Sequence, residues 1–421
     1  MQVKNSRPNS VSFRLLAGSL PVLLSVYVAI NPFPHKTAIE NISFYTSFLF
    51  ALILLAARKR TFHFRNPLTL PFVLFTGWSL VGLFFALDRQ NGIHDFYAHL
   101  VQYLIFFYLI VNFFSGEKRL SALIGVVIAA STVFALWVMI DFYAVQGFPF
   151  HTKLGLFSID ELSSNIIGTL TLFPMILALG WLIIDKTLYR RKAALTCLAI
   201  LGVATLATMA RSALIAMAVS LAVMVPLLMK DRRICACLAA LLLLALLIMP
   251  VRGRFVPSDL MDKLRETDRF MIALLYIEIV KDYPITGIGF GMEAYGEKDL
   301  LEKYNARLPA RYQQPAPAKA PHNSLIDVAV RTGLVGLAFF LYAVYVFVKM
   351  ALGLIRRGSS SYVREWGLCL LAAFTALFIQ GLFENTLSGP PAIALYAVMG
   401  MMTVLWHTEQ KQGSFQPMDQ A

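Results

Sequence analysis

The chain has 421 residues, of which 58% are hydrophobic and only 14% are charged. Soluble domains contain about 45–50% apolar and about 25% charged residues, so this composition excludes one large soluble domain. The formal net charge of +13 does not indicate nucleic-acid binding, because the basic residues recur between apolar stretches along the chain. We therefore predict an all-α integral membrane protein.

Apolar stretches long enough to cross a bilayer follow one another along the whole chain. A transmembrane helix needs about 20 apolar residues to span about 30 Å of hydrocarbon. About twelve stretches are long enough, and we predict a transmembrane helix in each. Their ranges are 13–32, 41–57, 67–87, 95–114, 119–146, 162–184, 193–210, 212–229, 234–250, 325–348, 364–386 and 389–407.

Lys and Arg are distributed unevenly between the two sets of alternate loops. The set that includes both termini carries most of them, for example at 186–192. The short loops of the other set hold only Lys36, Arg89, Lys153 and Arg211. Because basic residues stay on the cytoplasmic side, both termini are predicted to be cytoplasmic.

The longest loop, at 251–324, lies on the external side, opposite the cytoplasm, in this topology. It divides the chain into three parts. Residues 1–250 contain helices one to nine, the loop follows, and residues 325–421 contain helices ten to twelve and a cytoplasmic tail. Because the candidate polar residues gather in and around this loop, we expect it to carry the chemistry.

The loop begins with a helical pattern. From Ser258 to about Lys281 the apolar residues recur with the spacing of a helix on a membrane surface, and Pro284 ends the pattern. Arg265 and Arg269 lie four residues apart and so share one helix face. Two such arginines can bind a diphosphate through forked hydrogen bonds. Alternatively, they pair with the nearby carboxylates of Asp262, Glu266 or Asp268.

Arg211 lies at a very tight turn between the uncharged stretches 193–210 and 212–229. A lone guanidinium beside hydrocarbon is costly unless it meets an anion. We interpret Arg211 as a fixed cation that faces the external end of the helix bundle. The alternative is that its side chain extends to lipid headgroups.

His322, in the sequence APHNSL, lies where the loop returns to the membrane. A histidine there can accept a proton near neutral pH and act as a general base, although a loop histidine can also be inert. Asn323 is expected either to orient His322 or to cap the next helix. Glu384 and Asn385, near the end of the predicted helix 364–386, are further candidates for the same cavity.

Several patterns for metal or nucleotide chemistry are missing from the sequence. The external loops contain no DxD sequence and no paired carboxylates, and the four cysteines form no CxxC pair with a histidine. TGIGFG at 286–291 resembles a phosphate-binding loop but lacks the strand-turn-helix context, so we predict a turn. We expect no metal and no cofactor, and arginines would then stabilise any diphosphate leaving group.

Three segments, ATMARSAL, DRFMIALLYIEIVKDYPITGIGFG and APHNSLIDVAVRTGLVGLAFF, together resemble the O-antigen ligase family of bacterial inner-membrane proteins. Their order, the long late loop and the twelve-span layout are similar to those of the family. The resemblance implies a GT-C-type membrane glycosyltransferase whose active site is periplasmic.

The family's substrates follow from the same resemblance. The donor would be an O-antigen polysaccharide preassembled on undecaprenyl diphosphate, and the acceptor a sugar of the lipid A-core, without metal or ATP. O-antigen polymerases and protein O-oligosaccharyltransferases share the motifs and are alternatives. A polysaccharide or lipid transporter is a more distant alternative, because the predicted spans are nearly free of charge.

The resemblance also implies roles for individual residues. Arg211 and Arg269, with Arg265 assisting, would bind the donor diphosphate. The spacing to PITGIG favours Arg269 over Arg265 as the family's second arginine. His322 would act as the general base on the acceptor hydroxyl in a direct displacement that inverts the anomeric centre.

Overall fold

The computed structural model describes residues 11–34, 36–58, 61–155, 162–185, 187–229 and 268–411. All regular elements among these residues are helical, which confirms the predicted all-α class. The α-helices are α1 (Val11–Ile30), α2 (Thr37–Ala56), α3 (Thr69–Gly82), α4 (Arg89–Phe96), α5 (Gln102–Phe113), α6 (Glu117–Met139), α7 (Ser164–Ile184), α8 (Leu188–Ala207), α9 (Arg211–Leu228), α12 (Asp268–Asp282), α13 (Lys298–Asn305), α14 (Ser324–Arg357), α15 (Ser361–Gly381) and α16 (Gly389–Lys411). Short 3₁₀ or π-helical turns are η1 (Leu83–Phe85), η2 (Tyr97–Val101), η3 (Ile140–Val145), η5 (Ala294–Gly296) and η6 (Ala310–Tyr312).

Within the described residues, nine helices are long and apolar enough to cross a membrane. Each predicted span coincides with a helix, except 234–250, which lies outside the described residues. The α3–η1 stretch is apolar but shorter than the nine, and α8, which contains most of the predicted span 193–210, is not among the nine. The chain is therefore a helical membrane protein, and the count of twelve spans stays a prediction.

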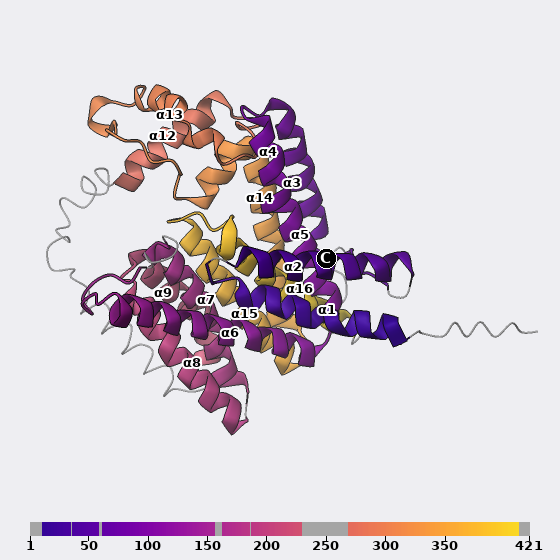
Figure 1. Ribbon diagram of the computed structural model, residues 1–421. Helices are drawn as coiled ribbons and strands as arrows, with labels where there is room; N and C mark the ends of the chain where they lie inside the picture. The colour runs from indigo at the N-terminus through magenta and orange to yellow at the C-terminus, as the bar shows by residue number, and fades with distance from the viewer. Residues whose placement is uncertain are drawn as a thin grey trace, which may run out of the picture.

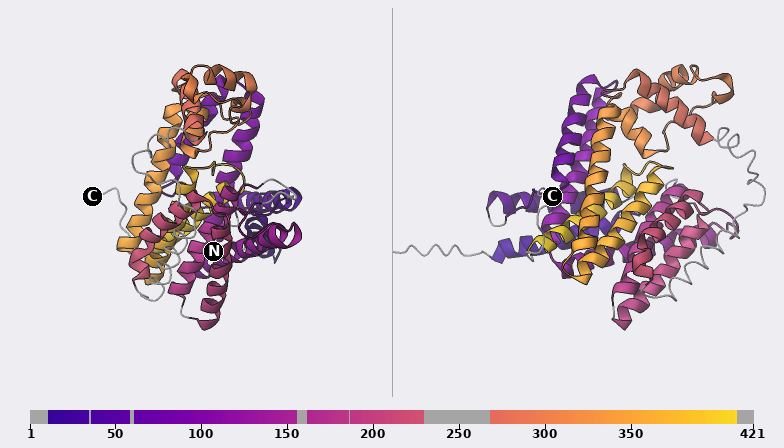
Figure 2. Two further views of the ribbon diagram at one scale, coloured as in Figure 1. Left: turned by 90° about the vertical axis from the view of Figure 1, so that its left-hand side faces the viewer. Right: turned by 180° about the vertical axis from the view of Figure 1, so that it is seen from behind.

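The helices form an elongated bundle with a separate helical part at one end (Figure 1). α14 packs against α3 and α15, and α16 packs against α5. α7 contacts α8, α9 and α15, while α1 and α2 pair with each other and extend to one side (Figure 2). α12 and α13 lie at the end of the bundle beside the first part of α14 (Figures 1 and 2). We call residues 268–323, which include α12 and α13, the loop segment.

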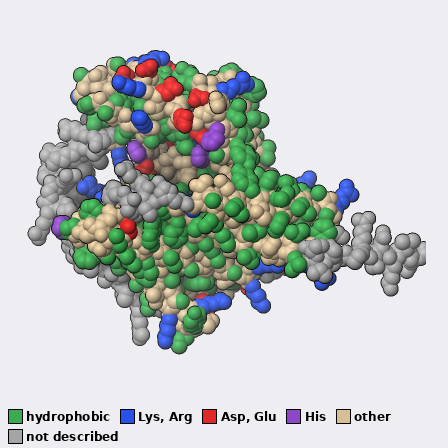
Figure 3. Space-filling view, in the orientation of Figure 1, with side chains coloured by type: hydrophobic (Ala, Val, Ile, Leu, Met, Phe, Trp, Pro, Cys, Tyr) green, Lys and Arg blue, Asp and Glu red, His purple; other side chains and the backbone are tan. Residues whose placement is uncertain are grey.

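Burial differs strongly between the helices. α7, α15 and α16 are mostly buried and form the centre, whereas only about a quarter of the residues in α1 and α2 are buried. Hydrophobic side chains cover much of the outer surface of the bundle in the view of Figure 3. Such an apolar exterior is unfavourable in water and is suited to a lipid environment.

The loop segment has a small hydrophobic core of its own. α12 ends at Asp282, just before Pro284, as the sequence predicts. Its residues Leu275, Tyr276 and Ile279 are fully buried among side chains of the loop segment and α14. This differs from the predicted membrane-surface helix, because α12 turns much of its apolar side towards protein. The proposed start of that helix near Ser258 lies outside the described residues.

Two glycines let the loop segment pack directly on the backbone of α14. Gly287 (φ 67°) and Gly333 (φ 69°) adopt left-handed conformations that favour glycine. A Cβ atom on Gly287 would overlap the carbonyl of Val330, and one on Gly333 would overlap that of Ile285. TGIGFG therefore forms the predicted turn, and its glycines serve backbone packing.

Two main-chain hydrogen bonds fix this packing. Ile288 N donates to Val330 O at 2.9 Å, and Leu334 N donates to Pro284 O at 2.7 Å. The second bond lies at the point where Gly333 interrupts the helical backbone of α14. The kink in α14 thus supplies the partners for the turn at 284–288.

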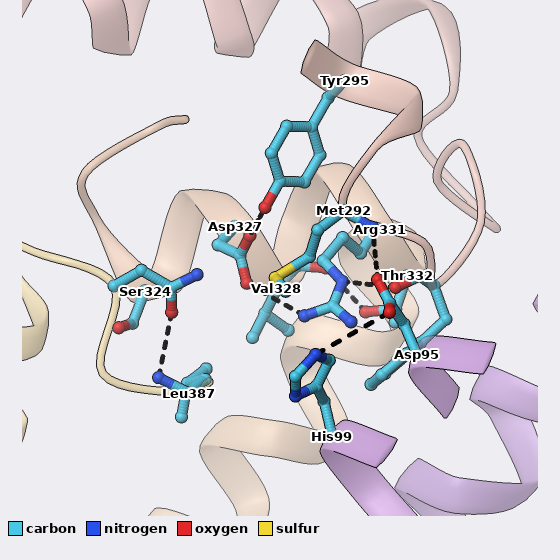
Figure 4. Close-up of polar contacts among 12 residues, drawn as sticks. Asp95, His99, Met292, Tyr295, Ser324, Asp327, Val328, Arg331, Thr332 and Leu387 are labelled. Atoms are coloured by element: carbon cyan, nitrogen blue, oxygen red, sulfur yellow. Dashed lines mark hydrogen bonds and ion pairs between the residues drawn. The ribbon is translucent and has the colours of Figure 1, made fainter. Parts of the chain in front are cut away.

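A buried ion pair strengthens the same junction (Figure 4). Arg331 and Asp327 on α14 are 3% and 0% exposed, and their charged atoms lie 3.3 Å apart. Arg331 Nε donates to Phe290 O at 2.7 Å, and the Tyr295 hydroxyl donates to Asp327 at 2.8 Å. The removal of one partner would leave a buried charge uncompensated, which is strongly destabilising.

A second buried carboxylate joins the loop segment to the start of the predicted span 95–114. Asp95 of α4 accepts from Met292 N at 2.7 Å and lies 3.7 Å from His99 Nε2 (Figure 4). Asp95, Asp327 and Arg331 show that the predicted spans contain more charge than the sequence analysis assumed. Asp327 and Arg331 pair with each other, Asp95 lies beside His99, and all three residues contact the loop segment, so they hold the fold together.

The glycine packing can be tested by adding one methyl group. We expect Gly333→Ala to cost about 2–4 kcal/mol, because it combines left-handed strain with overlap at Ile285. The thermal midpoint of the purified protein in detergent should fall by several degrees. Gly77→Ala is the matched control, since a Cβ there meets no atom within 4 Å. Equal midpoints for the two variants would contradict this account.

Candidate active site

His322 lies at the junction between the loop segment and α14. Its φ of 47° is uncommon for a residue with a side chain. The ring nitrogen Nδ1 lies 2.7 Å from Oε1 of Glu384, which follows α15. The structure thus brings together two candidate residues from different parts of the sequence.

Glu384 is held by two further groups. Asn165 Nδ2, in the first turn of α7, lies 3.3 Å from Glu384 Oε2. The backbone N–H of Asn385 lies 3.3 Å from Glu384 Oε1. Asn165, Glu384 and His322 therefore form a chain of polar contacts across three segments. The sequence analysis missed Asn165, because no local pattern near 165 points to a partner more than 200 residues away.

The backbone around this chain is fixed by side-chain hydrogen bonds. Asn323 Oδ1 caps α14 by accepting from Leu325 N and Ile326 N, and Asn323 Nδ2 donates to Leu382 O at 3.0 Å. Ser324 Oγ lies 3.2 Å from the Glu384 carbonyl oxygen. Asn323 therefore holds the start of α14 against the turn that carries Glu384.

The other candidate in this turn is Asn385. Its Oδ1 accepts from Leu387 N at 2.9 Å, which is the geometry of an Asx turn. The predicted helix 364–386 is shorter in the structure and ends at Gly381. Residues 382–388 form a turn that presents the Glu384 side chain towards His322.

The pKa values of His322 and Glu384 move apart. The hydrogen bond to Glu384 raises the pKa of His322, while burial and the charge of Arg269 oppose this effect less strongly. Burial tends to raise the pKa of Glu384, but the hydrogen bond and charge of His322 outweigh it and lower the pKa. With Nδ1 bound to the carboxylate, Nε2 of His322 is the nitrogen that can exchange a proton with a substrate.

Arg269, near the start of the described part of α12, faces the same region. Its guanidinium carbon lies 5.9 Å from the centre of the Phe383 ring, which is within the range of a cation–π contact. Phe383 immediately precedes Glu384. Because Glu384 is hydrogen-bonded to His322, this contact brings Arg269 to the side of the site that holds the histidine.

Arg211 is the first residue of α9 and follows a short turn after α8. The turn is as tight as predicted, with Met209 in a left-handed conformation (φ 48°). A positive charge at a helix N-terminus is opposed by the helix dipole, so Arg211 does not stabilise α9. Its side chain is exposed, which leaves it accessible to a ligand.

Lys153 is a further cation on this side of the bundle, and its neighbour Leu154 is hydrogen-bonded to Ala207 at the end of α8, just before Arg211. Burial lowers the pKa of Lys153, and the positive charges of Arg269 and then Arg211 lower it further. The sequence analysis counted Lys153 only as a loop cation. Within the described residues, no carboxylate forms an ion pair with any of these three cations.

Arg265 lies outside the described residues. In the part of the chain that the structure describes, no group of three or more His, Cys, Asp or Glu residues is arranged to hold a metal ion. The region of Arg211, Lys153 and Arg269 is instead suited to an anion.

An apolar cavity lies beneath the turn that carries Glu384. It is small, with a volume of about 40 Å³, and lies between α3, α14, α15 and α16. Ser324 and Thr386 line it together with apolar side chains that include Phe72, Phe340 and Phe378. In Figure 3 the surface is hollowed between the loop segment and the bundle, and basic side chains border the hollow.

The fold and this site define a helical membrane protein with a polar, cation-rich site at one end of the bundle. Residues 196–341 match the family model described as O-antigen ligase. This match covers about a third of the chain and supports the resemblance to the O-antigen ligase family that the sequence motifs predict. No curated protein matches the chain. Members of this family are glycosyltransferase-like enzymes that act on lipid-linked polysaccharides.

The matched range includes Arg211, Arg269 and His322 but not Glu384 or Asn165. The fold brings both residues to the site, where Glu384 is hydrogen-bonded to His322 and Asn165 is hydrogen-bonded to Glu384. The site therefore extends beyond the matched domain.

The effect of Glu384 on His322 can be measured without an activity assay. Diethyl pyrocarbonate modifies neutral imidazole, so the pH of half-maximal modification reports the pKa of His322. We expect this pH to exceed the ordinary value of 6.5 in the wild type and to fall in Glu384→Gln, as followed by mass spectrometry of the His322 peptide.

Glu278→Gln is the control, because Glu278 pairs with Lys281 on α12 and not with His322. It should leave the modification profile of His322 unchanged. If Glu384→Gln also leaves the profile unchanged, the hydrogen bond between His322 and Glu384 does not set the pKa.

Proposed function

We propose that the protein is an O-antigen ligase. It transfers a preassembled O-antigen polysaccharide from undecaprenyl diphosphate to a sugar of the lipid A-core. The observation that carries this proposal is a carboxylate-paired histidine, His322, beside arginines that have no carboxylate partner among the described residues. A base for a hydroxyl group and cations for a diphosphate are the two requirements of this reaction.

In the proposed reaction, His322 Nε2 accepts the proton of the acceptor hydroxyl. The hydroxyl oxygen attacks the anomeric carbon, and the bond from that carbon to the diphosphate oxygen breaks. The electron pair leaves with undecaprenyl diphosphate, so the anomeric configuration is inverted. Glu384 orients His322 and stabilises its protonated form, and Asn165 orients Glu384.

Arg211 and Arg269, assisted by Arg265, bind the donor diphosphate in this proposal. Fixed cations stabilise the charge that develops on the leaving group without the need for a divalent metal or ATP. Support comes from the exposure of Arg211 and Arg269 and from their shared effect on the pKa of Lys153. Repulsion among these cations is relieved when an anion binds.

The proposed location is the bacterial inner membrane, with both termini in the cytoplasm and the active site at the periplasmic face. The asymmetry of Lys and Arg between alternate loops supports this orientation. A GT-C-type architecture would present the site to lipid-linked substrates at the outer surface of the bilayer.

The activity test uses the full chain in detergent with lipid-linked O-antigen, lipid A-core and EDTA, and without nucleotide. We expect transfer by the wild type and a loss of about 10²–10⁴ in rate for His322→Ala. Arg269→Gln should lose about 10²–10³, because it removes one fixed charge from the leaving group. Gel mobility of the glycolipid product gives the rate.

Lys298→Gln is the control for loss of a positive charge, since the Lys298 side chain is 84% exposed and pairs with Glu302. Undiminished transfer by His322→Ala would overturn its role as the base. Transfer to another O-antigen unit or to a protein, but not to lipid A-core, would assign the chain to a different activity within the family.

A further inference from the structure

Lys153 lies on a short segment whose backbone is firmly held. The Tyr143 hydroxyl donates to Thr152 O at 3.1 Å, and Leu154 N donates to Ala207 O at 2.9 Å. The Leu154 side chain is fully buried in a cluster with Ile167 of α7. The two residues that flank Lys153 are thus fixed, and one of them is bonded to the last residue of α8.

This attachment places Lys153 next to the turn that leads into α9. Ala207 ends α8, and Arg211 begins α9 only four residues later. The bond from Leu154 to Ala207 therefore holds the segment of Lys153 against the α8–α9 turn that leads to Arg211.

Arg269 comes from the loop segment. Arg269 contacts the ring of Phe383, whose neighbour Glu384 is hydrogen-bonded to Asn165 at the start of α7. Ile167 of α7 packs against Leu154, next to Lys153, so these contacts bring the three cations from three parts of the chain to the same end of the bundle.

Apart from the contact of Arg269 with the Phe383 ring, no interaction among the described residues compensates the charges of these three side chains. All three are exposed, and none forms a hydrogen bond or ion pair within the described residues. Three like charges in one region repel each other, so the arrangement is unfavourable until an anion binds. An anion with several negative charges compensates them best.

On this geometry, and on the basis of the proposed function, we infer that Lys153 is a third cation of the donor site and makes it selective for a lipid diphosphate over a lipid monophosphate. Arginine forks can each engage one phosphate group, and a lysine adds a compact charge on a flexible stem. The diphosphate gains a further negative charge when the sugar leaves, so a third cation favours the departing product.

The inference is tested by binding, which does not require transfer activity. Farnesyl diphosphate and farnesyl monophosphate are suitable probes, titrated against the full chain in detergent by microscale thermophoresis at neutral pH. We expect the wild type to bind farnesyl diphosphate at least about tenfold more tightly than farnesyl monophosphate, because the second phosphate group forms one more charge-assisted contact. Lys153→Gln and Lys153→Met should lose most of this preference, whereas Lys153→Arg should keep it.

Lys298→Gln is again the matched control and should retain the wild-type ratio of the two Kd values. A wild-type ratio in both Lys153→Gln and Lys153→Met would overturn the inference. If the Lys153 variants lose affinity for both probes equally, the inference is also overturned, because Lys153 would then attract anions without selecting among them. If the wild type binds neither probe, the proposed donor site itself fails, and the proposed function fails with it.

Discussion

The candidate site is built from two parts of the chain, and it depends on how firmly these parts are joined. Arg269 and His322 belong to the loop segment, whereas Arg211 and Glu384 belong to the helix bundle. The junction consists of close backbone packing at Gly287 and Gly333 and of the buried pair Asp327–Arg331. Backbone contacts without intervening side chains leave little freedom for relative movement, so they can hold a histidine and a carboxylate within hydrogen-bond distance.

The site has two parts that differ in their electrostatics. Near His322, a positive charge that forms on the ring is balanced by Glu384, which raises the pKa of the base. Near Arg211 and Arg269, positive charge is left without a balancing carboxylate among the described residues. The first arrangement suits proton transfer, and the second suits the binding of an anionic leaving group. A reaction that moves a sugar from a diphosphate to a hydroxyl needs both in one place.

Much of the fold follows from local properties of the sequence. The length of the apolar stretches predicts the helices, Pro284 predicts the end of α12, and Asn323 predicts the cap of α14. The tight turn before Arg211 follows from the proximity of two apolar stretches. Family resemblance, and not periodicity, connects these features to a glycosyltransferase.

The contacts that complete the site could not be predicted in the same way. Asn165 meets Glu384 across more than 200 residues, and Lys153 is placed by a bond from Leu154 to Ala207. One missed feature did carry a signal, because Asp327 and Arg331 lie four residues apart inside an apolar span. Such a pair on one helix face predicts a buried ion pair.

The most direct test of the central claim is a cryo-electron microscopy structure of the protein with undecaprenyl diphosphate in lipid nanodiscs. We predict that the diphosphate contacts the guanidinium groups of Arg211 and Arg269, and that His322 Nε2 faces the oxygen from which the sugar has departed. A diphosphate bound away from these arginines, or too far from His322 to share one substrate with it, would contradict the account.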